Sequence, residues 1–493
     1  MTTFNSIDAA RMDRRAFLKT AGAAAGMGLL PPNLALAQGK VPILSVGTRT
    51  IEVNKQAAKV FHIAGMGGRS GLVAQEGDRL AGSLLNDTGE PLQMHWHGQT
   101  RAPNDQDRAR TGGGMLATGA SDVFDFELTP GTHWMHSHTL SEQQLLAAPM
   151  VTLEKNRGDV QDVIVMLHDF SFRSPQEILA ELGGSNAHAG HGSAPQAKSP
   201  APTTHAHGGH AMPQGAPAMP GHMMGMIHAN DVRYDAYLAN DRTLGDPEVV
   251  KVEKGGRVRL RIINGATATA FVVSTPALAS KVVAVDGSPC AAISTVSSPL
   301  SQGQRIDLLV EIPKEGGAFP VLAQVEDAQA QTGIVLATTG AAVAKQSSMA
   351  RANAGLLDLS LDAKLAATTP LPEKRADQSH MVMLGEETGY RWTINGRVHG
   401  EHEPFRFKQG ERVELTFMNP TSMMHPMHLH GHHFQVVGLG GRRYAGPVRD
   451  TLIVPPHMPV TVAFDAALKG SWFLHCHHLY HMATGMMTEV IIA

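Results

Sequence analysis

One short pattern occurs three times in the chain with the same internal spacing. A glycine turn leads into alternating apolar and polar residues and ends at an asparagine, over residues 77–86, 255–264 and 410–419. Alternation with a period of two predicts a strand that buries one of its faces. The copies are far enough apart for each to mark one domain of a tandem array.

A second pattern follows the first in the same order. A strand-like triplet, a turn and an aromatic-led segment occur over residues 124–138, 306–324 and 462–477, and only the second copy has no histidine. Short strands with frequent turn residues are typical of β-sandwiches. We therefore predict an all-β chain of three domains. The first and third should carry ligands, and the second should act as a spacer.

The histidine and methionine contents are unusual for a chain of this length. The 493 residues include 27 His and 25 Met but only two Cys, Cys290 and Cys476. Imidazole and thioether groups both bind copper. The formal net charge of −3 leaves no basic surface of the kind that binds nucleic acid, so we expect no nucleic-acid partner. We expect no disulfide, because Cys476 lies within a histidine cluster.

The first 37 residues are predicted to be an export signal. Arg14 and Arg15 precede a short Gly/Ala-rich apolar stretch, and Ala35 to Ala37 form a cleavage site before Gln38. This order resembles a twin-arginine signal, which predicts a periplasmic protein exported in the folded state. The apolar stretch is too short for a membrane span, so we expect no membrane insertion.

Residues 186–228 differ in composition from the rest of the chain. They are rich in Ala, Gly and Pro and include seven His and five Met, which predicts a disordered insertion in the second domain. A short helix is expected just before it, at Pro175 to Leu182. The insertion is either a solvated linker or a loop that gathers copper. We favour the loop, because thioethers select Cu(I).

Four histidine clusters are the strongest functional signal. Side chains at positions i and i+2 of a strand lie on the same face, so each cluster supplies a pair of imidazoles to one side. The four pairs are His95 and His97, His136 and His138, His428 and His430, and His475 and His477. If the first and third domains meet, eight imidazoles converge, which suits a cluster of three metal ions better than a single ion.

Cys476 lies between His475 and His477 and must point the opposite way. His425, His481 and Met486 are close enough in sequence to join it. A thiolate, two imidazoles and a weak axial thioether define a blue-copper electron-transfer site. The tripeptide would then connect this site covalently to the metal cluster.

These motifs resemble those of the three-domain multicopper oxidases, which include laccases and bacterial copper-resistance oxidases. The resemblance implies cupredoxin-like Greek-key β-sandwiches and four copper ions. It implies a type 2 copper held by His95 and His428. The implied ligands of the two type 3 coppers are His97, His136 and His477 for one, and His138, His430 and His475 for the other. The type 1 copper would be held by His425, Cys476 and His481, with Met486 as the axial ligand.

The expected domains are residues 38–157, 158–345 and 346–493, the last carrying the type 1 copper, in a monomeric chain. Substrate electrons should enter through the exposed edge of His481 or His425 and pass by Cys476 to the cluster, where O2 is reduced to water. The expected substrate is Cu(I), a phenolic compound or both. The alternatives are a general laccase acting on phenols and aromatic amines, and a non-catalytic periplasmic copper-binding protein. A nitrite reductase would lack the paired histidine clusters.

Carboxylates near the clusters are harder to assign. By the resemblance, Asp107 is a candidate proton donor for O2 reduction, with Asp105 as a possible substitute. Met482 stands where some cuprous oxidases have an acid, so that proton route is in doubt. Asp450 resembles a residue on a strand below the copper sites, and a structural salt bridge is an equal alternative. The remaining histidines near the clusters, His133, His432, His433 and His478, are expected not to be ligands.

Overall fold

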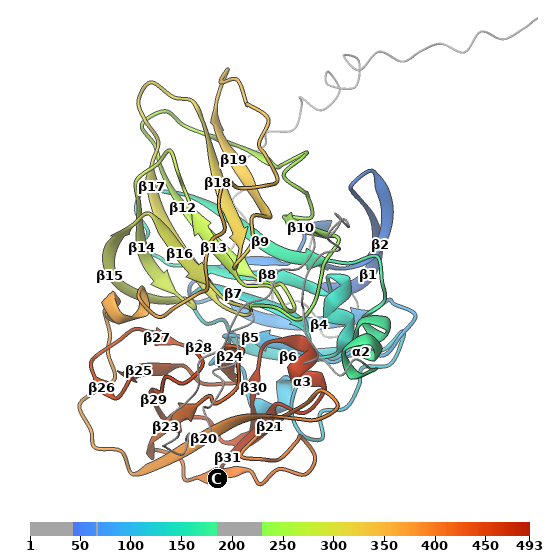
Figure 1. The fold of residues 1–493 in the computed structure, drawn as a ribbon, viewed down its shortest axis with the longest axis vertical. Helices are drawn as coiled ribbons and strands as arrows, with labels where there is room; N and C mark the ends of the chain where they lie inside the picture. The colour runs from blue at the N-terminus through green and yellow to red at the C-terminus, as the bar shows by residue number, and fades with distance from the viewer. Residues whose placement is uncertain (1–42, 66–67, 185–228) are drawn as a thin grey trace, which may run out of the picture. The chain divides into compact units, whose positions relative to one another are not determined.

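The computed structural model describes residues 43–65, 68–184 and 229–493 (Figure 1). All of them belong to one compact unit. The predicted export signal and the predicted insertion 186–228 therefore lie outside the described residues. No helix in the described ranges is both long enough and apolar enough to span a membrane.

The first domain consists of two facing four-stranded sheets. One has the order β2-β1-β4-β6 and the other β3-β8-β7-β5. The strands are β1 (Leu44–Val53), β2 (Gln56–Gly65), β3 (Leu72–Gln75), β4 (Arg79–Asn86), β5 (Met94–His97), β6 (Ser121–Glu127), β7 (Gly131–Ser137) and β8 (Ala147–Leu153).

The second domain has a six-stranded sheet, β10-β9-β12-β17-β14-β15, and a five-stranded sheet, β11-β19-β18-β13-β16. The strands are β9 (Gln161–Phe170), β10 (Ala236–Ala239), β11 (Val249–Val252), β12 (Arg257–Asn264), β13 (Phe271–Ser274), β14 (Ser280–Val285), β15 (Ser288–Thr295), β16 (Ser297–Leu300), β17 (Arg305–Glu311), β18 (Ala318–Val325) and β19 (Gln331–Thr338).

The third domain has a sheet of order β21-β20-β23-β29-β25-β26, with β27 paired to β25, and a second sheet, β22-β31-β30-β24-β28. The strands are β20 (Gln378–Glu387), β21 (Arg391–Ile394), β22 (Phe405–Phe407), β23 (Arg412–Met418), β24 (His425–Leu429), β25 (Phe434–Leu439), β26 (Arg442–Arg443), β27 (Val448–Arg449), β28 (Thr451–Val454), β29 (Val460–Asp465), β30 (Gly470–Cys476) and β31 (Met487–Ile492).

The three domains repeat the same connectivity. Each contains one parallel pair in its first sheet, β1 with β4, β9 with β12, and β20 with β23. Each contains another in its second sheet, β3 with β8, β11 with β19, and β22 with β31. Parallel neighbours need a crossover connection, so a repeated pair of crossovers is a specific topological match. The prediction of an all-β chain of three sandwiches is confirmed.

The repeated sequence pattern forms the same strand and turn in each domain. Its strands are β4, β12 and β23, and the asparagines that end it are Asn86, Asn264 and Asn419. Each asparagine amide donates to two backbone carbonyls, at 2.7–3.0 Å, and each side-chain oxygen accepts the backbone N–H two residues on. The asparagine therefore recurs because it satisfies buried backbone groups where the strand ends.

Helices are few in the described part of the chain. The helix expected before the insertion is present as α2 (Pro175–Gly184), which buries Ile178 and Leu182. A five-residue helix, α3 (Leu479–Ala483), follows β30, and a 3-10 helix, η3 (Leu140–Gln144), follows β7. Both α3 and η3 begin directly after a histidine cluster.

Candidate metal centres

Two adjacent strands of the first domain present its four candidate histidines. β5 and β7 pair antiparallel, with His95 directly opposite His136, and all of their residues are buried. His97 lies two residues beyond His95 on β5, and His138 follows the end of β7. Because side chains alternate along a strand, His95 and His97 lie on the same face of this sheet, as predicted.

In the third domain, the adjacent strands β24 and β30 present the other candidate histidines. His428 lies opposite His475, and Met427 lies opposite Cys476. Paired residues share a face and successive residues alternate, so the histidines face one side of this sheet and Cys476 faces the other. Cys476 packs in the hydrophobic core of the third domain. The predicted separation of the thiol from its flanking imidazoles is therefore seen in the structure.

The eight imidazoles from the two domains come together in three groups. His95 Nε2 lies 3.3 Å from His428 Nε2. The Nε2 atoms of His138 and His430 lie 3.2 and 3.0 Å from His475 Nε2. In the third group, His97 Nδ1, His136 Nε2 and His477 Nε2 are buried without a hydrogen-bond partner. These contacts agree with the ligand sets that the family resemblance implies, and donor atoms of different sets, such as those of His95, His428 and His430, also lie within 4.8 Å of one another.

This donor set fits metal ions. Burial lowers the pKa of most of these imidazoles well below the usual value, and that of His475 to about 3, so the rings are neutral with lone pairs available. A buried nitrogen without a partner is costly in a folded protein. Metal ions in the space between the rings would satisfy all of these lone pairs at once.

The second ring nitrogens are held by neighbouring oxygens. His95 Nδ1 donates to Asp107 Oδ2 at 2.7 Å, and His136 Nδ1 lies 3.1 Å from Glu142 Oε2. His97 Nε2 lies 3.1 Å from Asp450 Oδ1, and His428 Nδ1 lies 2.9 Å from the Asp450 carbonyl oxygen. Such partners fix which nitrogen faces a metal and raise its basicity.

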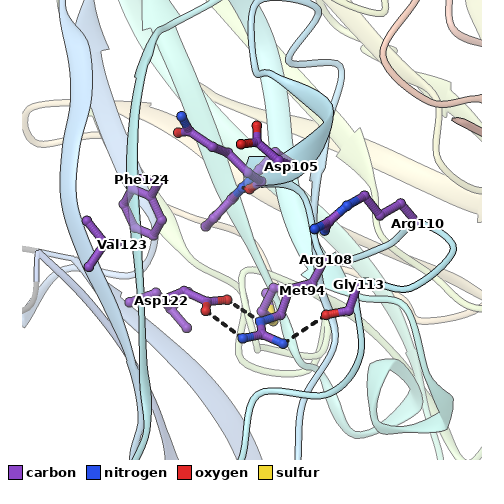
Figure 2. Close-up of a pocket in the computed structure, with 11 residues that line it drawn as sticks. Met94, Asp105, Arg108, Arg110, Gly113, Asp122, Val123 and Phe124 are labelled. Atoms are coloured by element: carbon purple, nitrogen blue, oxygen red, sulfur yellow. Dashed lines mark hydrogen bonds and ion pairs between the residues drawn. The ribbon is translucent and has the colours of Figure 1, made fainter. Parts of the chain in front are cut away.

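Asp107 and Asp105 occupy different environments. Asp107 is buried against His95, whereas the side chain of Asp105 is exposed. Asp105 lines a small hollow that also contains the ion pair between Arg108 and Asp122 (Figure 2). Of these two carboxylates, only Asp107 contacts an imidazole of the cluster.

Cys476 meets His425 and His481 on the other side of the sheet. The Cys476 Sγ lies 3.7 Å from His425 Nδ1 and 3.8 Å from His481 Nδ1, and the two nitrogens are 3.2 Å apart. Met486 is fully buried, and its carbonyl accepts the N–H of Cys476 at 3.0 Å. Burial raises the pKa of the Cys476 thiol, so a bound cation is needed to hold it as a thiolate at neutral pH.

The outer side of this second site is covered by other residues. His481 and His425 are both fully buried, so the expectation of an exposed imidazole edge is wrong. His481 Nε2 lies 3.4 Å from Asp231 Oδ2, and the Tyr390 hydroxyl donates to the same carboxylate oxygen. The Trp392 ring stacks on His481 with centroids 3.9 Å apart. Asp231 cannot be identified from the sequence, because no local pattern connects it to a residue 250 positions away.

Within its described residues, the second domain supplies none of the twelve candidate ligands but contributes to the cluster. Arg305 of β17 is fully buried and donates to both carboxylate oxygens of Asp450, each at 2.6 Å. Asp450 in turn contacts His97 and His428. Asp450 thus both forms a buried salt bridge and orients candidate ligands. The second domain is therefore more than the predicted spacer, because its Arg305 holds a carboxylate that contacts candidate ligands.

The histidines expected not to be ligands have other partners. His133 Nε2 donates to the Pro130 carbonyl at 3.0 Å, and His432 Nε2 accepts the Leu468 N–H at 3.2 Å. His433 lies 3.4 Å from Asp450, and His478 lies 3.1 Å from Asp231. Each of these four imidazoles therefore faces a polar group outside the three groups of cluster nitrogens.

A cavity of about 1020 Å³ extends to the cluster from one side. Its wall includes His138 and Phe473, together with Met482, Glu489 and the stacked pair His399 and His402. The cavity therefore borders the imidazole cluster at His138.

Comparisons with known proteins agree with this geometry. Family models described as multicopper oxidase match residues 45–156, 188–347 and 372–493. The chain is 30% identical to the multicopper oxidase MmcO of Mycobacterium tuberculosis, with 85% of this chain and 80% of that protein covered. It is 23% identical to copper resistance protein A of Escherichia coli, covering 97% and 99%. Laccase-4 of Thanatephorus cucumeris is 25% identical, covering 82% and 80%.

Solved structures show the same fold. Fet3p, described as a multicopper oxidase that functions in iron import, superposes with a TM-score of 0.71 at 17% identity, covering 91% of this chain and 89% of that one. A multicopper oxidase from Pseudomonas thermotolerans gives 0.65 at 20% identity, covering 91% and 98%.

Proposed function

Because the chain belongs to the multicopper oxidase family, we propose that it oxidises Cu(I) and passes the electrons to O2. The enzyme is a copper-dependent oxidoreductase that uses O2 as the acceptor and binds four copper ions. When bound, these ions supply the one-electron chemistry that connects the substrate to the four-electron reduction of O2 to water. The choice of Cu(I) rests on the Asp231 carboxylate beside His481.

We propose that the copper ligands are the buried imidazoles and the thiol described above. The type 1 copper would be held by His425, Cys476 and His481, with Met486 axial, and the type 2 copper by His95 and His428. The proposed type 3 ligands are His97, His136 and His477 for one ion and His138, His430 and His475 for the other. The support is the set of buried nitrogens that face one another without other partners.

Asp231 makes the surroundings of His481 suitable for a small cation. Burial would raise its pKa, but His478 and His481 outweigh burial and hold the pKa well below the usual range, so the group is anionic. Its side chain is 19% exposed, whereas His481 is buried behind it. A copper ion could reach this carboxylate directly, whereas a phenol ring would have to displace the cover formed with Tyr390. This difference favours Cu(I) over phenols as the substrate.

The sequence around Asp231 supports the same substrate. Asp231 lies two residues after Ala229, where the described chain resumes beyond residues 186–228 with their seven His and five Met. Thioethers select the soft ion Cu(I), and the negative charge of Asp231 attracts a small cation. We propose that the insertion gathers Cu(I) and that Asp231 receives it beside His481.

Oxygen uptake with Cu(I) and with a phenol tests the proposal. Asp231→Asn should lower kcat/KM for Cu(I) on the order of tenfold, a loss of about 1.4 kcal/mol, and change that for the phenol much less. Asp246→Asn, at an exposed carboxylate of the same domain, is the matched control and should change neither. Deletion of 186–228 should also lower Cu(I) turnover selectively. Equal losses for both substrates, or none, would contradict Cu(I) as the preferred substrate.

We also propose that the protein is exported to the periplasm by a twin-arginine signal. The support is the order of Arg14, Arg15, the apolar stretch and the small-residue site ending at Ala37. Replacing both arginines with lysine should leave the protein in the cytoplasm in a fractionation experiment. Unchanged export of that variant would contradict this route.

A further inference from the structure

The outer face of the third domain carries exposed methionines that the proposed copper sites do not use. Met381 and Met383 of β20 are 61% and 38% exposed. Met418, at the end of β23, is half-buried. A cluster of large apolar side chains on a solvated face often marks a binding site, whereas single exposed apolar residues are normal.

Strand register places these three side chains together. β20 and β23 are parallel neighbours, with Met383 opposite Met418 and Met381 opposite Thr416. Residues paired in this way share a face, and neighbouring strands lie about 4.8 Å apart. Met381 and Met383 are alternate residues of one strand and so also share that face. The three methionines therefore occupy three corners of a rectangle, with Thr416 at the fourth.

The described polar neighbours on this face are engaged with other side chains. The Thr416 hydroxyl is hydrogen-bonded to that of Thr461 at 3.0 Å. Glu414, two residues before Thr416, is paired with Arg443 at 2.6 Å. Methionine has three rotatable bonds and a polarizable sulfur, so thioethers anchored at these three corners can converge on one point.

We propose that Met381, Met383 and Met418 form a binding site for one Cu(I) ion. A group of thioethers selects a soft monovalent ion over harder divalent ones. The exposure of Met381 and Met383 leaves the site open to an ion from solution. The site is separate from the four copper centres, and its binding does not depend on the proposed function.

The position of the site also suggests its use, which does rest on the proposed function. The Met383 carbonyl accepts the backbone N–H of Asn395 at 2.7 Å, and the Met383 N–H donates to the Asn395 side-chain oxygen at 2.8 Å. Asn395 directly follows β21, whose Trp392 stacks on His481. The site is thus connected through Asn395 and β21 to the residues that pack against the proposed type 1 centre, to which it would supply Cu(I).

The test uses Ag(I), a redox-inert substitute for Cu(I), and the copper-loaded full-length chain labelled with ¹³C at the methionine methyl groups. The methyl signals of the three methionines should shift together and saturate at one Ag(I) per site. Met381→Leu should abolish the shift of the other two signals, because leucine keeps the bulk and removes the sulfur. Met383→Leu should act in the same way.

Matched controls come from two exposed methionines on other segments, Met115 and Met349, which are 47% and 53% exposed. Replacing either with leucine should leave the shared shift unchanged. Three signals that stay fixed, or that titrate independently with different midpoints, would overturn the site. Equal losses of Cu(I) and phenol oxidation in the Asp231 variant, or none, would contradict the proposed substrate and leave this result unaffected, so the two proposals fail separately.

Discussion

Asp107 and Asp105 are near neighbours in sequence but contact different groups. Asp107 accepts a hydrogen bond from His95 at 2.7 Å, whereas Asp105 faces a surface hollow. Removing an outer partner of a metal-binding imidazole typically costs ten- to a hundredfold in metal affinity or activity. Asp107→Asn should therefore reduce copper retention on dialysis, and oxygen uptake, by about that factor. Asp105→Asn should change neither. Equal effects of both variants would contradict the assignment.

Glu326 predicts a pH dependence that is unrelated to copper. Burial raises its pKa from 4.5 to about 8, and a hydrogen bond from the Leu357 N–H offsets only part of that effect. The folded state then holds a proton that the unfolded state has lost. Glu326 therefore contributes its full stabilisation below pH 4.5. As the pH rises, the free energy of unfolding falls by about 1.4 kcal/mol per pH unit until the pH passes 8.

Glu326→Gln should remove this loss, because glutamine keeps an acceptor for Leu357 and does not titrate. Its Tm relative to the native chain should rise between pH 5 and pH 8.5. Glu253→Gln, at an exposed position in the same domain, is the control and should show no such trend. A Tm difference that is independent of pH would contradict the buried, protonated state.

The histidines and Cys476 could be identified from the sequence because their relation is local. A period of two along a strand decides which of His475, Cys476 and His477 share a face, and no tertiary information is needed. The partners of these residues could not be identified in this way. Asp231 reaches His481 and Arg305 reaches Asp450 across domains, and only the fold specifies those contacts.

At the scale of strands, β17 of the second domain is tied to the third domain by one buried ion pair. Arg305→Ala would remove the guanidinium that neutralises the buried Asp450 carboxylate, which costs about 3–5 kcal/mol. A large fall in Tm and a loss of bound copper should follow, because Asp450 also contacts His97. Arg79→Ala breaks an exposed pair with Asp125 and should cost at most about 1 kcal/mol. Similar Tm values for the two variants would contradict a structural role for β17 at the cluster.

The repeated strand is the element that the sequence predicted best. β4, β12 and β23 lie where the glycine-to-asparagine pattern places them, because alternation and a turn-forming asparagine are both local signals. The sheet order was not predictable to the same degree. The parallel pairs in each domain depend on crossovers between distant strands, about which periodicity carries no information.

At the scale of the whole molecule, copper should hold the first and third domains together. Both domains contribute imidazoles to the same groups, so removing the metal leaves buried nitrogens without partners at their interface. Chelation should lower the Tm, and returning copper should restore it, whereas Mg²⁺ should not. An unchanged Tm after complete copper removal would contradict a metal-bridged interface.

The metal-free protein should also be sensitive to acid. Burial lowers the pKa of His138 and His430 below the usual 6.5, so the unfolded state binds protons that the folded state excludes. Stability from these groups is present above pH 6.5 and is lost as the pH falls below it. The Tm of the metal-free chain should therefore drop between pH 7 and pH 5. A flat Tm over this range would show that the imidazoles are not buried as described.

The domain limits at 157/158 and 345/346 remain predictions. They fall in segments without strands, between β8 and β9 and between β19 and β20. The monomeric state is likewise a prediction, and sedimentation of the copper-loaded chain at several concentrations would test it.

The division into a thiolate site and an imidazole cluster, joined at Cys476, is tested most directly by copper content and absorption together. The native chain should bind four copper ions and show the intense blue absorption of a Cys thiolate bound to Cu(II). Cys476→Ser should bind three, lose the blue absorption and stop consuming O2, while the eight imidazoles still hold their ions. A Cys476→Ser variant that stays blue, or that still reduces O2 with its substrate, would contradict this division.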